Sequence, residues 1–286
     1  QRSAHFSRRA VIQALAETHP AGAGPGVLEA LADDFLARSC VPLSPPRIDG
    51  SAGHQEALYS VPEMLQCEAS LLAWAAGIDP GGGRVATARA IQADQAAAVG
   101  HLCSGETRVR LMEARAGTGK TFTLQAVREA YEASGIPVIG TSWQGQAADV
   151  LEREAGIASQ TAALLLDRIA RGDENAIPAG AVIVGDEAAM MPTRALERLA
   201  RRAAARGARL VLIGDRAQLP AIDAAGGFAA LADRLGAVEL TASRRQRTEL
   251  QRSVADSLAA GRADAALSLL SEHGRIAGFA DARDAR

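Results

Sequence analysis

The sequence predicts an α/β fold built on a parallel sheet, and three observations indicate it. Short apolar runs alternate with amphipathic helical patterns between residues 87 and 236. A glycine-rich segment follows the first of these runs and opens a helix, as in phosphate-binding loops. Two later runs end in acidic residues, at Asp186-Glu187 and at Asp215. The chain has 286 residues, which suits one large domain or two ordinary ones.

We divide the chain into three regions: 1–86, 87–236 and 237–286. The first is predicted to be helical. Ser7 can cap a helix that extends through Glu17, and a second helix is expected from Leu28 to Ala37.

Two breaker-rich stretches interrupt this helical region. The segment 42–46 is Pro-Leu-Ser-Pro-Pro and is expected to be a loop. Ser60 and Glu63 are spaced as a capping box, with Pro62 in the first turn of a third helix. The glycine-rich segment 79–83 is expected to end that helix as a linker.

In the middle region, each predicted strand is a short apolar run and each helix has a 3.6-residue period. The expected strands are Val109–Glu113, Pro137–Thr141, Ala181–Val184 and Arg209–Ile213, and the expected helices are 120–133, 144–154, 161–171 and 193–205. From Val238 a further strand and helix are expected to begin the third region.

Composition limits the classes of function. The net charge is −2, which gives no support to nucleic-acid binding by bulk electrostatics, although arginines can line a groove locally. Three dispersed cysteines and five dispersed histidines argue against a zinc site and a disulfide framework. No run of 18 apolar residues or signal core occurs, so we expect a cytoplasmic protein without a membrane span. Because the chain does not begin with Met, we expect a fragment of a longer protein.

The one lysine of the chain, Lys120, lies in a phosphate-loop pattern. Its compact ammonium would reach the β- and γ-phosphates of a nucleotide, and the Thr121 hydroxyl would bind Mg²⁺. The preceding glycines allow the loop to turn its amide N–H groups toward an anion. The predicted nucleotide-binding residues of this segment are Ala116, Gly117, Thr118, Gly119, Lys120, Thr121 and Phe122.

Two acids at the end of the run 181–185 complete this pattern. Asp186 would hold Mg²⁺ through water, and Glu187 would polarise the attacking water. A GTPase would add an Asn-Lys-x-Asp segment, which a chain with one lysine at Lys120 lacks. ATP and Mg²⁺ are therefore the expected cofactors.

The segment 214–220, Gly-Asp-Arg-Ala-Gln-Leu-Pro, resembles motif III of superfamily 1 helicases. The resemblance implies that Gln218 lies near the γ-phosphate and links it to bound DNA. The segment 91–98 is similar to the one whose glutamine contacts adenine, which implies that role for Gln95, although the segment taken alone favours an ordinary amphipathic helix. The segment 141–148 resembles motif Ia, along the single-strand path. It implies that Trp143 stacks on a base and that Gln146 lies near the DNA backbone, and the alternative for Trp143 is a core position.

The segment 240–247 resembles motif IV, where the second RecA-like domain begins. The resemblance implies that Arg245 is an arginine finger for the γ-phosphate. Arg244 and Arg247 are competing candidates, and a solvated helix start is a further alternative.

Within superfamily 1 the sequence looks most like the helicase portion of conjugative relaxases, with RecD-like helicases next. This resemblance implies a RecA-like P-loop ATPase that moves on single-stranded DNA, in contact with the conjugation machinery. The alternatives are a RecD-like helicase of DNA repair, a P-loop ATPase that does not act on nucleic acid, and a binding module without turnover. For residues 1–286 in isolation we expect weak ATP binding and no unwinding.

Overall fold

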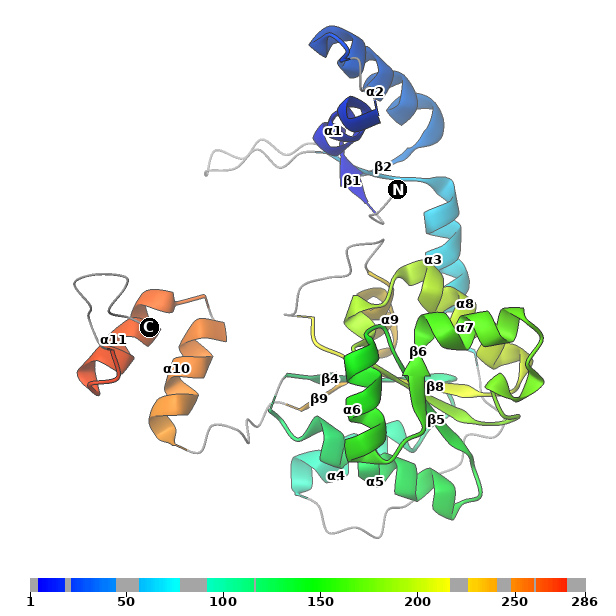
Figure 1. The fold of residues 1–286 in the computed structure, drawn as a ribbon, viewed down its shortest axis with the longest axis vertical. Helices are drawn as coiled ribbons and strands as arrows, with labels where there is room; N and C mark the ends of the chain where they lie inside the picture. The colour runs from blue at the N-terminus through cyan, green and yellow to red at the C-terminus, as the bar shows by residue number, and fades with distance from the viewer. Residues whose placement is uncertain are drawn as a thin grey trace.

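Six parallel strands form the central sheet in the computed structural model of this protein (Figure 1). Their order is β6–β5–β7–β8–β4–β9. The structure describes residues 5–18, 22–44, 57–77, 92–115, 117–216, 226–240, 248–259 and 261–276. The strands are β4 (Val109–Ala114), β5 (Val138–Ser142), β6 (Ser159–Thr161), β7 (Val182–Asp186), β8 (Arg209–Gly214) and β9 (Val238–Leu240).

The two central strands, β7 and β8, are buried on both faces, which is why they are continuous apolar runs in the sequence. All four strands predicted in the middle region form within one or two residues of their expected bounds. The predicted α/β fold with a parallel sheet is confirmed.

Helices cover both faces of this sheet. One apolar cluster joins α3, α7, α8 and α9 to residues such as Ile183 and Leu212. The other joins α4, α5 and α6 to residues such as Val184 and Ile213. The helices are α3 (Pro62–Ala75), α4 (Ala93–Leu102), α5 (Lys120–Ala133), α6 (Gly145–Ala155), α7 (Ala162–Ala170), α8 (Thr193–Ala205) and α9 (Gly227–Leu235), with 3₁₀ turns η1 (Glu174–Ala176) and η2 (Ala188–Met190).

The strand that we expected to open a second domain belongs to the first sheet. β9 pairs in parallel with β4, with Ala114 opposite Leu240. Farther along, α10 (Glu249–Ala259) packs against α11 (Ala263–Glu272). We therefore propose that the boundary of the third region follows Leu240 rather than residue 236, because strand pairing ties Val238–Leu240 to the sheet.

The N-terminal region combines helices α1 (Arg8–Thr18) and α2 (Pro25–Ser39) with a small antiparallel sheet of order β1–β3–β2. The amide of Ala10 donates to Ser7 Oγ at 3.4 Å, so the predicted cap by Ser7 is confirmed. The sheet was not predicted. Its strands are β1 (Phe6–Ser7), β2 (Val41–Ser44) and β3 (Leu58–Ser60).

Two predictions for this region are wrong. Residues 42–44 lie in strand β2 rather than a loop, and Pro42 is tolerated there because β2 is an edge strand. Val61, and not Ser60, is the N-cap of α3, since Ser60 is buried as the last residue of β3. Pro62 occupies the first helical position, as expected. The predicted linker 79–83 lies outside the described residues.

Among the described residues, no helix is both long enough and apolar enough to cross a membrane.

Candidate nucleotide site

The loop between β4 and α5 has the conformation that its glycines allow. Gly117 and Gly119 have φ values of 83° and 87°, in the left-handed region that side chains disfavour. The Thr118 hydroxyl donates to the carbonyl oxygen of Arg115 at 2.9 Å and fixes the turn. The loop therefore brings the N-terminus of α5, the positive end of the helix dipole, to the carboxyl edge of the sheet. Ala116 lies outside the described residues.

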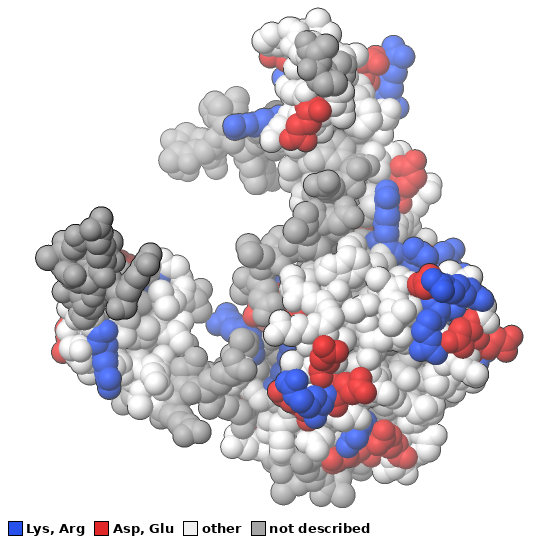
Figure 2. All heavy atoms as spheres, viewed as in Figure 1, with Lys and Arg blue, Asp and Glu red and all other residues white. Residues whose placement is uncertain are grey.

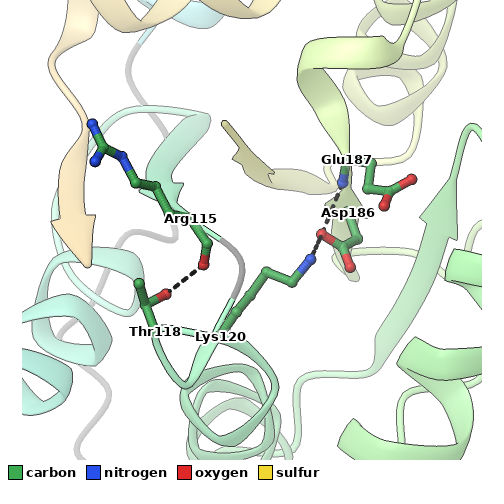
Figure 3. A network of polar contacts seen from close by, with 5 residues as sticks. All are labelled: Arg115, Thr118, Lys120, Asp186 and Glu187. Atoms are coloured by element: carbon green, nitrogen blue, oxygen red, sulfur yellow. Dashed lines mark hydrogen bonds and ion pairs between the residues drawn. The ribbon is translucent and has the colours of Figure 1, made fainter. Parts of the chain in front are cut away.

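Lys120 and Asp186 form the central contact of this edge (Figure 3). Lys120 Nζ, at the start of α5, lies 2.8 Å from Asp186 Oδ1, at the end of β7. Strand β8 lies between β7 and β4, the strand that precedes the phosphate loop. Asp186 is only 4% exposed, so the ammonium compensates a carboxylate that burial would otherwise disfavour. The amide of Glu187 also donates to Oδ1, at 2.8 Å.

Glu187 lies beyond Asp186 as seen from Lys120 (Figure 3) and has an unusual backbone. Among the described non-glycine residues it alone has a positive φ, of 52°. Its Oε2 atom is buried without a hydrogen-bond partner. Burial and the Asp186 charge raise the pKa of the Glu187 carboxyl, and the Lys120 ammonium opposes this rise. The site thus holds an acceptor oxygen that no described group uses.

Gln95 lies against the phosphate loop. It is buried in α4, and its Nε2 atom donates to the carbonyl oxygen of Gly119 at 3.4 Å. The same oxygen accepts from the Thr123 amide at 3.1 Å. The structure therefore brings Gln95 to the loop backbone, and its role toward adenine stays a prediction. Thr121 and Phe122 lie in the first turn of α5, where Phe122 is exposed.

The motif Ia segment begins with the last two residues of β5, which is hydrogen-bonded to β7. Trp143 is 38% exposed, which excludes the core alternative for this residue. Gln146 is exposed in the first turn of α6. Gln144 Nε2 lies 3.7 Å from Met190 Sδ and connects this segment to η2. Stacking on DNA by Trp143 stays a prediction.

After β8 the chain is held by Arg216, a residue that sequence reasoning missed. Its guanidinium lies 2.7 Å from Glu113 Oε1 and 2.6 Å from Asp233 Oδ1, and so connects β4 to α9. Gln218 lies outside the described residues, as do Arg244, Arg245 and Arg247. Their predicted roles stay predictions.

Ser142 is a second residue that sequence reasoning missed. It is the last residue of β5, it is buried, and it lies opposite Asp186 in the strand register. A polar residue that ends a strand beside the acidic strand is the sequence signal, but the signal has meaning only once the strand order is known.

Charges of both signs are interspersed on the face of the molecule seen in Figure 2. This distribution fits the net charge of −2. An attraction to DNA through this face would depend on particular side chains rather than on a broad basic surface.

A parallel sheet with a Gly-Lys-Thr loop at its carboxyl edge and an Asp-Glu pair at the end of β7, two strands away from β4, defines a P-loop nucleotide-binding protein. Comparison with known proteins agrees with this class. The chain belongs to the AAA domain family, whose model matches residues 90–281.

The similar curated proteins are conjugal transfer proteins. The chain is 35% identical over 255 residues to conjugal transfer protein TraA of Rhizobium radiobacter, a match that covers 85% of this chain and 23% of that protein. It is 37% identical to TraA of Agrobacterium fabrum, over 61% of this chain and 16% of that protein. It is also 37% identical to a probable TraA of Sinorhizobium fredii, over 64% and 16%. The chain thus spans less than a quarter of each relative, and the predicted likeness to conjugative proteins is confirmed.

Among solved structures, a DNA replication initiation factor matches 74% of this chain and 61% of its own with a TM-score of 0.33 and 14% identity.

Proposed function

We propose that this chain is the ATP-hydrolysing part of a DNA motor, and that it couples hydrolysis to movement on single-stranded DNA during conjugal transfer. The contact between Lys120 and Asp186 carries the proposal, because it unites the phosphate loop with the acidic strand in one site. The curated relatives bear the name conjugal transfer protein, and the DNA role rests on them and on the helicase-like motifs.

The phosphates of ATP would lie over the amides of residues 117–119 and the N-terminus of α5. Lys120 would exchange its contact with Asp186 for the β- and γ-phosphates. Thr121 and Asp186 offer the oxygen ligands that Mg²⁺ prefers, so the residues fit this metal. When bound, Mg²⁺ neutralises charge on the phosphates.

Glu187 is the group that we assign to the attacking water. Its unpartnered Oε2 can accept a proton or a hydrogen bond from a water beside the γ-phosphate. Gln218 would sense the γ-phosphate, and Arg245 would stabilise charge in the transition state. Loss of such a finger lowers the rate by about 10³–10⁵-fold.

Trp143 would provide the stacking platform for DNA, since its exposed ring lies at the end of the strand next to β7. A base stacked on an aromatic ring contributes about 1–3 kcal/mol. Gln146, exposed in the following turn, would lie near the DNA backbone.

The test is ATP hydrolysis by the natural protein with and without single-stranded DNA. We expect DNA to stimulate hydrolysis. We expect Lys120→Arg to lower hydrolysis on the order of tenfold or more, because the planar guanidinium keeps the charge but cannot make the same charge-assisted hydrogen bond to phosphate as the compact ammonium. Arg153→Lys, on the exposed face of α6, is the matched control and should leave hydrolysis unchanged. Hydrolysis that DNA does not stimulate would contradict the motor and favour an ATPase unrelated to nucleic acid.

A further inference from the structure

Strand β5 ends in two buried hydroxyl groups that have no hydrogen-bond partner. Thr141 and Ser142 are both 0% exposed, and neither Thr141 Oγ1 nor Ser142 Oγ meets a donor or acceptor. A buried hydroxyl without a partner costs about 1–3 kcal/mol. An alanine or valine at either position would avoid this cost, and the face of the sheet on which each hydroxyl lies decides whether a ligand can reach it.

The two hydroxyls lie on opposite faces of the sheet. Ser142 is opposite Asp186 in the parallel register, and in-register residues of neighbouring strands share a face. That face continues through Val184 into the cluster beneath the phosphate-loop helix α5. Thr141 is opposite Gly185 and faces the other way, toward the cluster that contains Ile183. Only Ser142 therefore lies on the face of the Lys120–Asp186 contact.

The unused oxygens near Asp186 are suited to accept hydrogen bonds from the waters of a bound Mg²⁺. Mg²⁺ in nucleotide sites keeps several of its waters, and these waters are hydrogen-bond donors that need acceptors. Asp186 Oδ1 already accepts from Lys120 and from the Glu187 amide. Ser142 Oγ, on the strand beside Asp186, and Glu187 Oε2 are buried oxygens that the described contacts leave unused.

We propose that Ser142 is a positioning residue for the metal, and that its hydroxyl accepts a hydrogen bond from a water of the hydrated Mg²⁺ held at Asp186. The inference rests on the proposed nucleotide function and gives Ser142, in the segment that resembles motif Ia, a role toward the metal that the resemblance does not imply. Outer partners of this kind change metal affinity by about 10–100-fold.

The test compares Ser142→Ala with Thr141→Val. Each variant removes one unpartnered hydroxyl from β5, but only the first removes it from the metal face. Mn²⁺ serves as the probe, and its affinity is measured by electron paramagnetic resonance in the presence of a non-hydrolysable ATP analogue. We expect Ser142→Ala to weaken Mn²⁺ binding about tenfold. Thr141→Val should leave it unchanged, and both variants should bind the analogue in EDTA as the wild type does.

Each contrary result has its own meaning. Equal Mn²⁺ affinity in Ser142→Ala and wild type would overturn the role of Ser142 and leave the nucleotide function standing. A wild-type protein that binds no Mn²⁺ with the analogue would contradict the proposed function itself. Urea unfolding without metal should show Ser142→Ala at least as stable as wild type, because an unpartnered hydroxyl is gone. A marked loss of stability would show that the hydroxyl serves the fold and would overturn the inference.

Discussion

Glu187 has a backbone conformation that side chains disfavour and a carboxylate whose negative charge is disfavoured by burial and by Asp186. A non-glycine residue in the left-handed region stores about 1–3 kcal/mol, which the surrounding structure must hold. Here the Glu187 amide is bound by Asp186 and its carbonyl oxygen accepts from the Met190 amide at 2.9 Å, so both sides of the residue are fixed. These two hydrogen bonds hold the Glu187 backbone in its disfavoured conformation directly beside Asp186.

This residue makes the stability of the protein depend on pH. Because the pKa of Glu187 is raised on folding, the folded state holds the proton more tightly than the unfolded chain. As the pH rises from the ordinary glutamate value of 4.5 through the raised value, the protein should lose stability. Glu187→Gln removes this loss, so the variant should have the higher urea midpoint at neutral pH, and its advantage should shrink as the pH falls.

The measurement is urea unfolding at several pH values, with Glu154→Gln on exposed α6 as the control. The control should follow the wild type, since exposed ion pairs contribute little. A Glu187→Gln advantage that does not change with pH would show that the effect is not electrostatic.

At the scale of elements, Gly214 allows three segments to meet. It ends β8, and a Cβ atom there would lie 2.8 Å from the Phe228 ring of α9 and 3.1 Å from the amide of Ala189 in η2. Phe228 is buried, and η2 follows Glu187 directly. The absence of a side chain at Gly214 therefore determines how closely β8 approaches α9 and the turn after Glu187.

Gly214→Ala should therefore destabilise the protein by about 1–3 kcal/mol through overpacking. It should also weaken nucleotide binding, because it displaces the turn after Glu187. Gly100→Ala is the matched control: nothing lies within 4 Å of its added Cβ, and a helical alanine should gain about 0.5–1 kcal/mol. Equal unfolding midpoints for the two variants in urea would contradict the packing argument.

The elements that the sequence predicted well are those whose own residues determine them. Strands β4, β7 and β8 are apolar runs, and their burial follows from composition. Strand β6, with the residues Ser-Gln-Thr, has no apolar run, and its strand form comes from pairing with β5. A pattern within one segment carries no information about such a partner.

At the scale of the whole molecule, the N-terminal region and the sheet share a core. Leu71 of α3 is buried in the cluster that contains Leu111 of β4 and Leu212 of β8, and α3 packs against α8 and α9. The predicted division after residue 86 stays a prediction, but the core crosses it.

Leu71→Ala should cost about 2–5 kcal/mol, as for other buried leucines, and should lower the stability of the sheet. Leu31→Ala, at an exposed site of α2, should change stability by no more than about 0.5 kcal/mol. The readout is urea unfolding followed through nucleotide binding. If Leu71→Ala leaves the urea midpoint of this transition unchanged, α3 and the sheet do not share a cooperative core.

The candidate site was predictable where spacing along the chain is enough. Gly117, Gly119 and Lys120 form one local pattern, and Asp186 ends a recognisable strand. Ser142 was not predictable, because its relation to Asp186 depends on which strands are neighbours and in which register. Register is a property of the assembled sheet.

Strand β9 connects the chain after Leu240 to the phosphate loop through a single pair of hydrogen-bonded strands. It pairs with β4 so that Leu240, its last residue, lies opposite Ala114, one residue before the loop that begins at Arg115. Tension applied to the chain after Leu240 would load the backbone hydrogen bonds between these two strands first. Because the phosphate loop follows Ala114 directly, such a load would act next to the residues that we propose to bind the nucleotide.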